Sequence, residues 1–166
     1  VTSAGRWGLG VAGFYVLFEA VDRFVQAGYR AIGLEIGPAQ RTPLAARTVA
    51  EFWGRRWNAI VHRWLASVAF FPLARRGHVA LAGLAAFALS AAIHTYLVIP
   101  GVGLAAGLRM GAFFVVQGLL VVIERALGIA RAPAWVGHAW TVACFVATVP
   151  LFIEPFLRLA GFPPLP

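Results

Sequence analysis

The chain has 166 residues, of which 61% are hydrophobic and 12% charged, and its mean hydropathy is +0.81. Soluble domains carry about 25% charged residues, so this composition excludes an ordinary soluble domain and indicates an integral membrane protein. Fourteen Arg, no Lys and six acidic residues give a formal charge of +8. Long apolar runs separate the arginines, which argues against nucleic acid and favours phosphates at a membrane surface.

The single cysteine and the start of the chain set two further limits. Cys144 has no second cysteine to pair with, which excludes an intrachain disulfide and a cysteine metal cluster. No pattern in the sequence indicates a metal or another cofactor. The chain begins at Val1 and its only Met is Met110. We therefore expect one membrane domain, 1–166, that is the C-terminal part or a shortened form of a longer protein.

Apolar runs of about 20 residues can cross a bilayer as helices. They predict an all-α integral membrane protein with about four transmembrane helices, at 7–29, 78–99, 108–124 and 136–157. Within the first run, Arg23 follows Glu19 by four residues, which predicts an ion pair on one helix. The residues GPAQRTP at 37–43 predict a loop.

The segment AEFWGRRWNAIVHRWL at 50–65 differs from the rest of the chain in its density of Trp and Arg. Thr48 followed by Glu51 is a capping-box pattern and predicts a helix start. On a helix that continues from there, the apolar stripe holds Trp53, Trp57, Ile60, Trp64 and Val68, and the opposite stripe holds Glu51, Arg55, Asn58 and His62. This pattern predicts an amphipathic helix at headgroup depth. Such an anchor does not explain Asn58, which adds no charge and lowers helix propensity.

The apolar run at 58–74 is short and contains His62 and Arg63. If it crossed the membrane, the Arg-rich loops would lie on both sides. If it is interfacial or re-entrant, they all lie on one side and the uncharged connection at 100–107 lies on the other. The positive-inside rule favours the second arrangement. We expect the protein to lie in the cytoplasmic membrane if it is bacterial, and otherwise in the endoplasmic reticulum.

His94 lies deep in the apolar run at 78–99, one helical turn after Ser90. An ionisable group inside a span costs roughly 2.5–3.5 kcal/mol when charged, and so indicates function by default. A structural hydrogen bond is the commoner role of an isolated buried histidine. His78 and His138 lie near span ends, which predicts interfacial positions.

Two patterns concern helix packing. Gly103, Gly107 and Gly111 repeat the spacing that allows close helix approach in membranes. Glu154 beside Pro155 predicts a kink or the end of a span.

EFWGRRWN at 51–58 and LSAAIHTY at 89–96 together resemble the wax-synthase-like branch of the membrane-bound O-acyltransferase superfamily. In that branch, an FWGRRWN-like segment on a cytoplasmic-side helix precedes an intramembrane His in an SGxxHE-like pattern. Here His94 follows Asn58 by 36 residues, a separation similar to the family's. Thr95 occupies the position at which the branch often has Glu. The resemblance implies that His94 and Asn58 are a catalytic pair.

The resemblance also implies a reaction, the transfer of a fatty acyl group from acyl-CoA to a lipophilic alcohol at the membrane. His94 would act as general base and Asn58 as a hydrogen-bond donor to the reacting carbonyl. Substrate contacts would come from Arg55, Arg56, Trp57, Arg63 and Ser90, with the arginines near the CoA phosphates. Positive-inside charge explains the arginines equally well.

Two other interpretations remain open. A non-catalytic membrane subunit or acyltransferase remnant, which binds lipid or a partner membrane protein, is favoured by the short chain and by Thr95. A haem or pigment protein would need a second intramembrane His, yet His78 and His94 lie about 24 Å apart along one helix. An absorbance spectrum tests the haem protein, and turnover separates the enzyme from the remnant.

Overall fold

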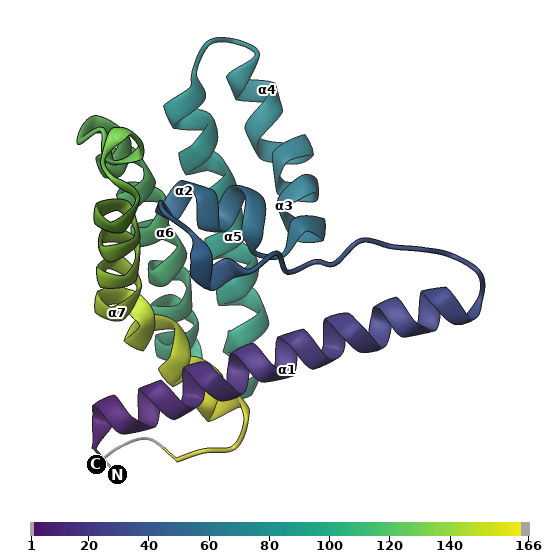
Figure 1. Ribbon diagram of the computed structural model, residues 1–166. Coiled ribbons are helices and arrows are strands. Elements are labelled where there is room, and N and C mark those ends of the chain that lie inside the picture. The colour runs from purple at the N-terminus through teal and green to yellow at the C-terminus, as the bar shows by residue number, and fades with distance from the viewer. Residues whose placement is uncertain (1, 164–166) are drawn as a thin grey trace.

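The computed structural model describes residues 2–163, and the regular structure within that range is helical. Three long helices form a bundle: α5 (Val79–Val102), α6 (Leu104–Ala126) and α7 (Ala134–Leu159). Figure 1 shows them side by side, running up and down in turn. They are the helices in the described range that are long and apolar enough to cross a membrane. This confirms the predicted all-α membrane fold and the three later spans.

The first predicted span differs from these three. Residues 7–29 lie within a long helix, α1 (Ser3–Ala31), which runs across the bundle rather than along it (Figure 1). Arg6 and Glu19 leave only a short apolar stretch between them, so α1 is not among the helices apolar enough to cross a membrane. Glu19 and Arg23 form the predicted ion pair, with 2.8 Å between carboxylate oxygen and guanidinium nitrogen.

Glycines on α6 allow α5 to approach closely. A side chain at Gly107 would meet the backbone of Thr95, and one at Gly111 would overlap the Thr95 hydroxyl. The close approach predicted from the glycine spacing is therefore confirmed at these two positions. Gly103 instead forms the turn between α5 and α6, with a φ of 86° that favours glycine.

The chain between α1 and α5 consists of short elements. Residues 37–42 have no regular structure, as predicted, and Pro43 opens a single 3₁₀ turn, η1 (Pro43–Ala45). Thr48 caps the next helical segment, as the capping-box pattern predicts, by accepting the Glu51 N–H at 2.8 Å. That segment comprises α2 (Val49–Glu51) and the π-helical turn η2 (Phe52–Arg56).

The predicted continuous amphipathic helix through 51–68 is wrong, because the chain breaks after η2. Trp57 is extended and Asn58 has a φ of 43°, in the left-handed region. A new helical run then begins, formed by α3 (Ala59–Leu65), η3 (Ala66–Phe70) and α4 (Phe71–Ala74). At 1.5 Å per residue the run is about 24 Å long, shorter than the hydrocarbon core of about 30 Å. Figure 1 shows it beside one half of α5, so it does not form a separate long span.

The break also separates the predicted apolar stripe. Trp53 packs inside, edge-on to Phe113, and Trp57 stacks on Phe52 with ring centroids 5.6 Å apart. Trp64 remains half exposed. Only the part of the stripe after the break, on α3 and η3, therefore presents an apolar surface to the outside.

Candidate active site

A large apolar cavity of about 1130 Å³ lies between the bundle, α1 and the short elements. It extends from the end of α6 that carries Arg125 to the end of α7 at Leu159. Four of the seven predicted site residues line it: Trp57, Asn58, Ser90 and His94. The structure thus brings the two predicted catalytic residues to one cavity, although they come from different elements.

His94 projects from the middle of α5 and is held on two sides. Its Nδ1 lies 2.8 Å from the carbonyl oxygen of Ser90. The imidazole ring stacks on Phe114 of α6, with 4.0 Å between ring centroids. A carbonyl oxygen can only accept, so Nδ1 carries the proton and Nε2 keeps its lone pair. This tautomer leaves Nε2 as the basic nitrogen of the ring.

Asn58 stands at the break before α3. Its Oδ1 accepts the Val61 N–H at 3.2 Å, which caps the first turn of α3. Because the backbone N–H is a donor, the atom facing it is the amide oxygen. The amide NH₂ therefore remains to donate to another group.

Hydrogen bonds to the loop at 37–42 hold Asn58 in its left-handed conformation. The Asn58 N–H donates to the side-chain oxygen of Gln40 at 3.3 Å, and the Ala59 N–H donates to the Ala39 carbonyl at 2.9 Å. Asp22 of α1 accepts the Ala39 N–H at 3.1 Å. The loop at 37–42 thus ties Asn58 to α1, which the sequence pattern did not predict.

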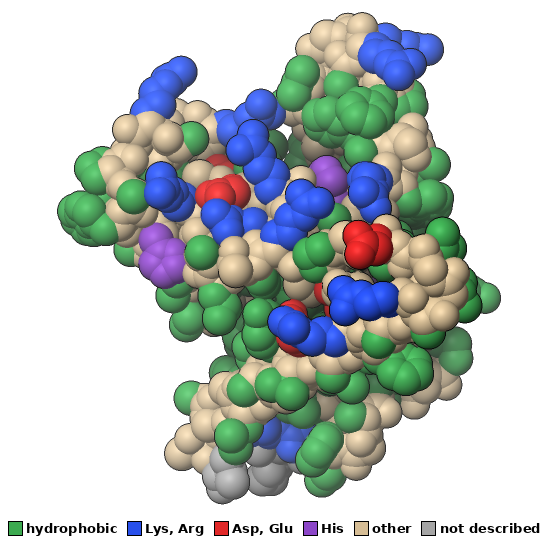
Figure 2. Space-filling model, turned by 45° about the vertical axis from the view of Figure 1, so that its right-hand side comes forward, with side chains coloured by type: hydrophobic (Ala, Val, Ile, Leu, Met, Phe, Trp, Pro, Cys, Tyr) green, Lys and Arg blue, Asp and Glu red, His purple; other side chains and the backbone are tan. Residues whose placement is uncertain are grey.

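The three predicted arginines lie in different surroundings. Arg56 is engaged by protein groups, since it pairs with Glu51 at 2.7 Å and donates to the Thr42 hydroxyl at 2.9 Å. Arg63 is exposed and does not line the large cavity. Arg55 is exposed and, with Arg47, lines a smaller pocket of about 410 Å³ next to residues 129–137. Figure 2 shows arginine side chains gathered over the upper half of one face of the molecule.

The other histidines occupy three different places. His62 of α3 lines the large cavity, and partial burial together with the neighbouring Arg63 guanidinium lowers its pKa. His138 of α7 also lines the large cavity, and its Nδ1 lies 3.1 Å from the Ala46 carbonyl oxygen. His78 is exposed and directly precedes α5. The cavity positions of His62 and His138 were not predicted.

Buried polar groups on α6 and α7 form contacts that the sequence pattern did not predict. Gln117 is fully buried, accepts the Trp53 indole N–H at 3.2 Å and donates to the Thr148 hydroxyl at 2.8 Å. Glu124 is buried and bonds to the backbone of α2. Their position in an apolar run was the available signal.

Glu154 of α7 links this last helix to the start of α1. Its carboxylate accepts from Trp7 at 3.3 Å and pairs with Arg6 and Arg158, each at 3.4 Å. It therefore fixes α1 against α7, beyond the kink or span end predicted from its sequence position.

Comparison with known proteins places these features in a family. A model of the membrane bound O-acyl transferase family matches residues 37–119, half of the chain. A long-chain-alcohol O-fatty-acyltransferase of Simmondsia chinensis is 30% identical over 101 residues, which cover 56% of this chain and 29% of that protein. The match thus spans less than a third of that relative, and no solved structure matches the chain significantly. The matched region includes Asn58, His94 and most of the cavity wall from α3 to α6, and the chain belongs to the membrane bound O-acyl transferase family.

Proposed function

We propose that this protein transfers a fatty acyl group from acyl-CoA to a lipophilic alcohol, with His94 as general base and Asn58 as donor to the reacting carbonyl. One observation carries the proposal: His94 and Asn58 line the same apolar cavity, and the histidine Nε2 and the asparagine NH₂ have no hydrogen-bond partner among residues 2–163. Both groups are oriented by protein hydrogen bonds before any substrate binds.

The reaction balances with these groups alone. His94 Nε2 removes the proton of the alcohol as its oxygen attacks the thioester carbonyl carbon. The new C–O bond forms, and the carbonyl electrons move to the oxygen. When they return, the C–S bond breaks and the imidazolium proton passes to the departing sulfur. The products are an ester and CoA with a free thiol.

The NH₂ group of Asn58 is suited to stabilise the oxyanion that forms between these steps. A side-chain NH₂ that donates to the developing negative charge lowers the barrier by about 2.7–4 kcal/mol in comparable sites. The Asn58 oxygen is already occupied by α3, so the amide does not need to reorient during the reaction.

The cavity wall and the arginines near it fit an acyl donor that has an apolar tail and an anionic head. The cavity wall is mainly aliphatic and aromatic, which suits an acyl chain. Arg125 lines the same cavity at one end, and Arg47 and Arg55 line the smaller pocket. Guanidinium groups at this end would bind the phosphates of CoA. The similarity to a long-chain-alcohol O-fatty-acyltransferase of Simmondsia chinensis supports a long-chain alcohol as acceptor.

The test is CoA thiol release by the purified protein in lipid nanodiscs. Palmitoyl-CoA is supplied with long-chain alcohols or sterols, and the reaction is repeated without an acceptor. Acceptor-dependent release that disappears in His94→Ala supports the proposal. Equal release by wild type and His94→Ala, with both proteins folded, contradicts it and favours a remnant that binds lipid or a partner membrane protein.

A further inference from the structure

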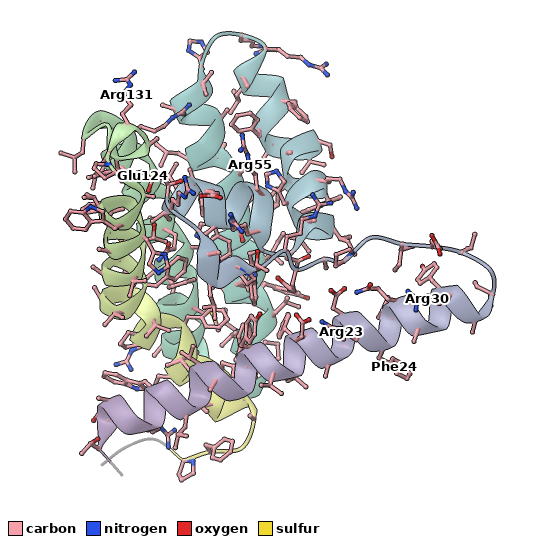
Figure 3. All side chains as sticks on the ribbon, in the orientation of Figure 1. Arg23, Phe24, Arg30, Arg55, Glu124 and Arg131 are labelled. Atoms are coloured by element: carbon pink, nitrogen blue, oxygen red, sulfur yellow. The ribbon has the colours of Figure 1, made fainter. Side chains whose placement is uncertain are left out.

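Glu124 makes an unusual set of bonds for a carboxylate inside the bundle. It lies near the end of α6 that faces Arg131 (Figure 3) and is 3% exposed. Its Oε2 accepts the Val49 N–H and its Oε1 accepts the Ala50 N–H, each at 2.8 Å. Both carboxylate oxygens therefore accept hydrogen bonds from backbone N–H groups of a segment that lies far away in the sequence.

These two N–H groups are among the free donors at the start of α2. The first N–H groups of a helix have no partner within it. Thr48 accepts the Glu51 N–H, and Glu124 accepts those of Val49 and Ala50. A helix cap is thus completed by a side chain from another helix.

Helix α7 holds the same segment from the other side. At Gly137 an added side chain would overlap the Arg47 carbonyl, so glycine is needed for the close approach. His138 donates from Nδ1 to the Ala46 carbonyl at 3.1 Å. Val49 is fully buried between these contacts. The segment 46–50 is therefore fixed between α6 and α7.

The face of α6 that carries Glu124 also contacts both parts of the candidate site. Phe114, Gln117 and Glu124 are spaced by three and seven residues, so they lie on one side of the helix. Phe114 stacks on His94, and Gln117 accepts the Trp53 N–H. One helix face thus sets the position of His94 and of the segment that leads to Asn58.

We propose that Glu124 is a positioning residue, whose carboxylate fixes residues 49–50 on α6 and thereby sets the place of Asn58 relative to His94. The effect of Glu124 on the rate of acyl transfer rests on the proposed function, whereas its hydrogen bonding to residues 49–50 does not.

A carboxylate is suited to this position because two donors need two acceptors. In Glu124→Gln the amide NH₂ would face one of the backbone N–H groups, which would then be buried without a partner. Glu124→Asp keeps both acceptors on a side chain one methylene shorter. The exposed Glu35, which lies in the loop after α1, gives a matched control in Glu35→Gln.

The experiment combines amide hydrogen exchange with a double-mutant cycle, both on the purified protein in nanodiscs. In Glu124→Gln, exchange at residues 49–51 should become about tenfold faster, while α5 peptides keep their rates. The kcat for acyl transfer should fall about 10- to 100-fold because Asn58 is misplaced. In an Asn58→Ala background the same change should lower kcat less than about twofold further, since the two residues act as a unit. Glu35→Gln should change neither quantity.

Three results would overturn the proposal. These are unchanged exchange at residues 49–51, faster exchange throughout the protein, or effects of Glu124→Gln and Asn58→Ala that simply multiply. If Glu124→Gln does not fold, Glu124→Asp is measured against the same criteria. If wild type transfers no acyl group, the proposed function fails, and exchange at Val49 and Ala50 alone decides whether Glu124 holds the segment.

Discussion

His94 is oriented by the backbone of Ser90 rather than by its hydroxyl. The imidazole Nδ1 lies 2.8 Å from the Ser90 carbonyl oxygen and 3.4 Å from the Ser90 hydroxyl oxygen. Thr95, the residue after His94, packs near Gly111 of α6 instead of supporting the imidazole. A main-chain carbonyl one turn earlier on α5 therefore fixes the tautomer of His94.

This arrangement predicts opposite outcomes for two neighbouring substitutions. Ser90→Ala keeps the carbonyl, so kcat for acyl transfer should change little, by less than about threefold. His94→Gln removes the base and should lower kcat by about 10²- to 10⁴-fold. Steady-state CoA release measures both. A large loss in Ser90→Ala, at unchanged melting temperature, would show that the hydroxyl itself contributes to the reaction.

Asn58 allows its structural and chemical roles to be separated. In Asn58→Asp a carboxylate oxygen can still accept the Val61 N–H, and aspartate tolerates the left-handed conformation. The melting temperature should therefore stay close to that of wild type. The donor NH₂ is lost, so kcat should fall about 10²- to 10³-fold.

Asn58→Gly serves as the companion variant. Glycine accepts the φ of 43° but provides neither the cap nor the donor. It should lose activity to a similar extent as Asn58→Asp. Activity retained in both variants would remove Asn58 from the mechanism.

Much of the fold could be predicted from composition and short-range pattern. The three long apolar runs predicted α5, α6 and α7, and the glycine spacing predicted the close approach at Gly107 and Gly111. The capping-box pattern located the start of α2 at Thr48. Each of these signals depends on residues within a few turns of one another, which the sequence displays directly.

What the sequence did not show depends on contacts between distant residues. Helical periodicity continued through Trp57, but the hydrogen bonds from Asn58 and Ala59 to residues 39–40 favour a break there. Asp22 holds residues 39–40 in turn by accepting their backbone N–H groups. The roles of Glu124 and Gln117 were missed because their partners lie 31 to 75 positions away in the sequence. The apolar run at 7–29 predicted a span, but α1 is not among the helices apolar enough to cross a membrane, and Arg6 pairs with Glu154 to hold this helix against α7.

Glu51 should make the stability of the protein depend on pH. Burial raises the pKa of its carboxyl, but bonds from the Arg47 N–H and the Arg56 guanidinium outweigh burial and lower it. A lowered folded-state pKa adds stability above the unfolded value of about 4.3, and this stability is lost as pH falls through the folded value. Glu51→Gln should thus lower the melting temperature at pH 7, and the difference from wild type should shrink below about pH 4. Glu35→Gln is the control, and a pH-independent difference for Glu51→Gln would contradict the prediction.

Gly111 should be among the positions least tolerant of a larger side chain. A Cβ there would overlap the Thr95 hydroxyl and lie 3.3 Å from the Ala91 carbonyl oxygen. Because α5 and α6 meet at this point, Gly111→Ala should force them apart and cost about 1–3 kcal/mol. The shift would also move Phe114, one turn later, away from the His94 ring. Gly13→Ala on α1 is the matched control, since its Cβ would enter open space and alanine favours the helix. Thermal unfolding in nanodiscs should therefore show a lower melting temperature for Gly111→Ala only, and equal values would mean that α5 and α6 have room to adjust.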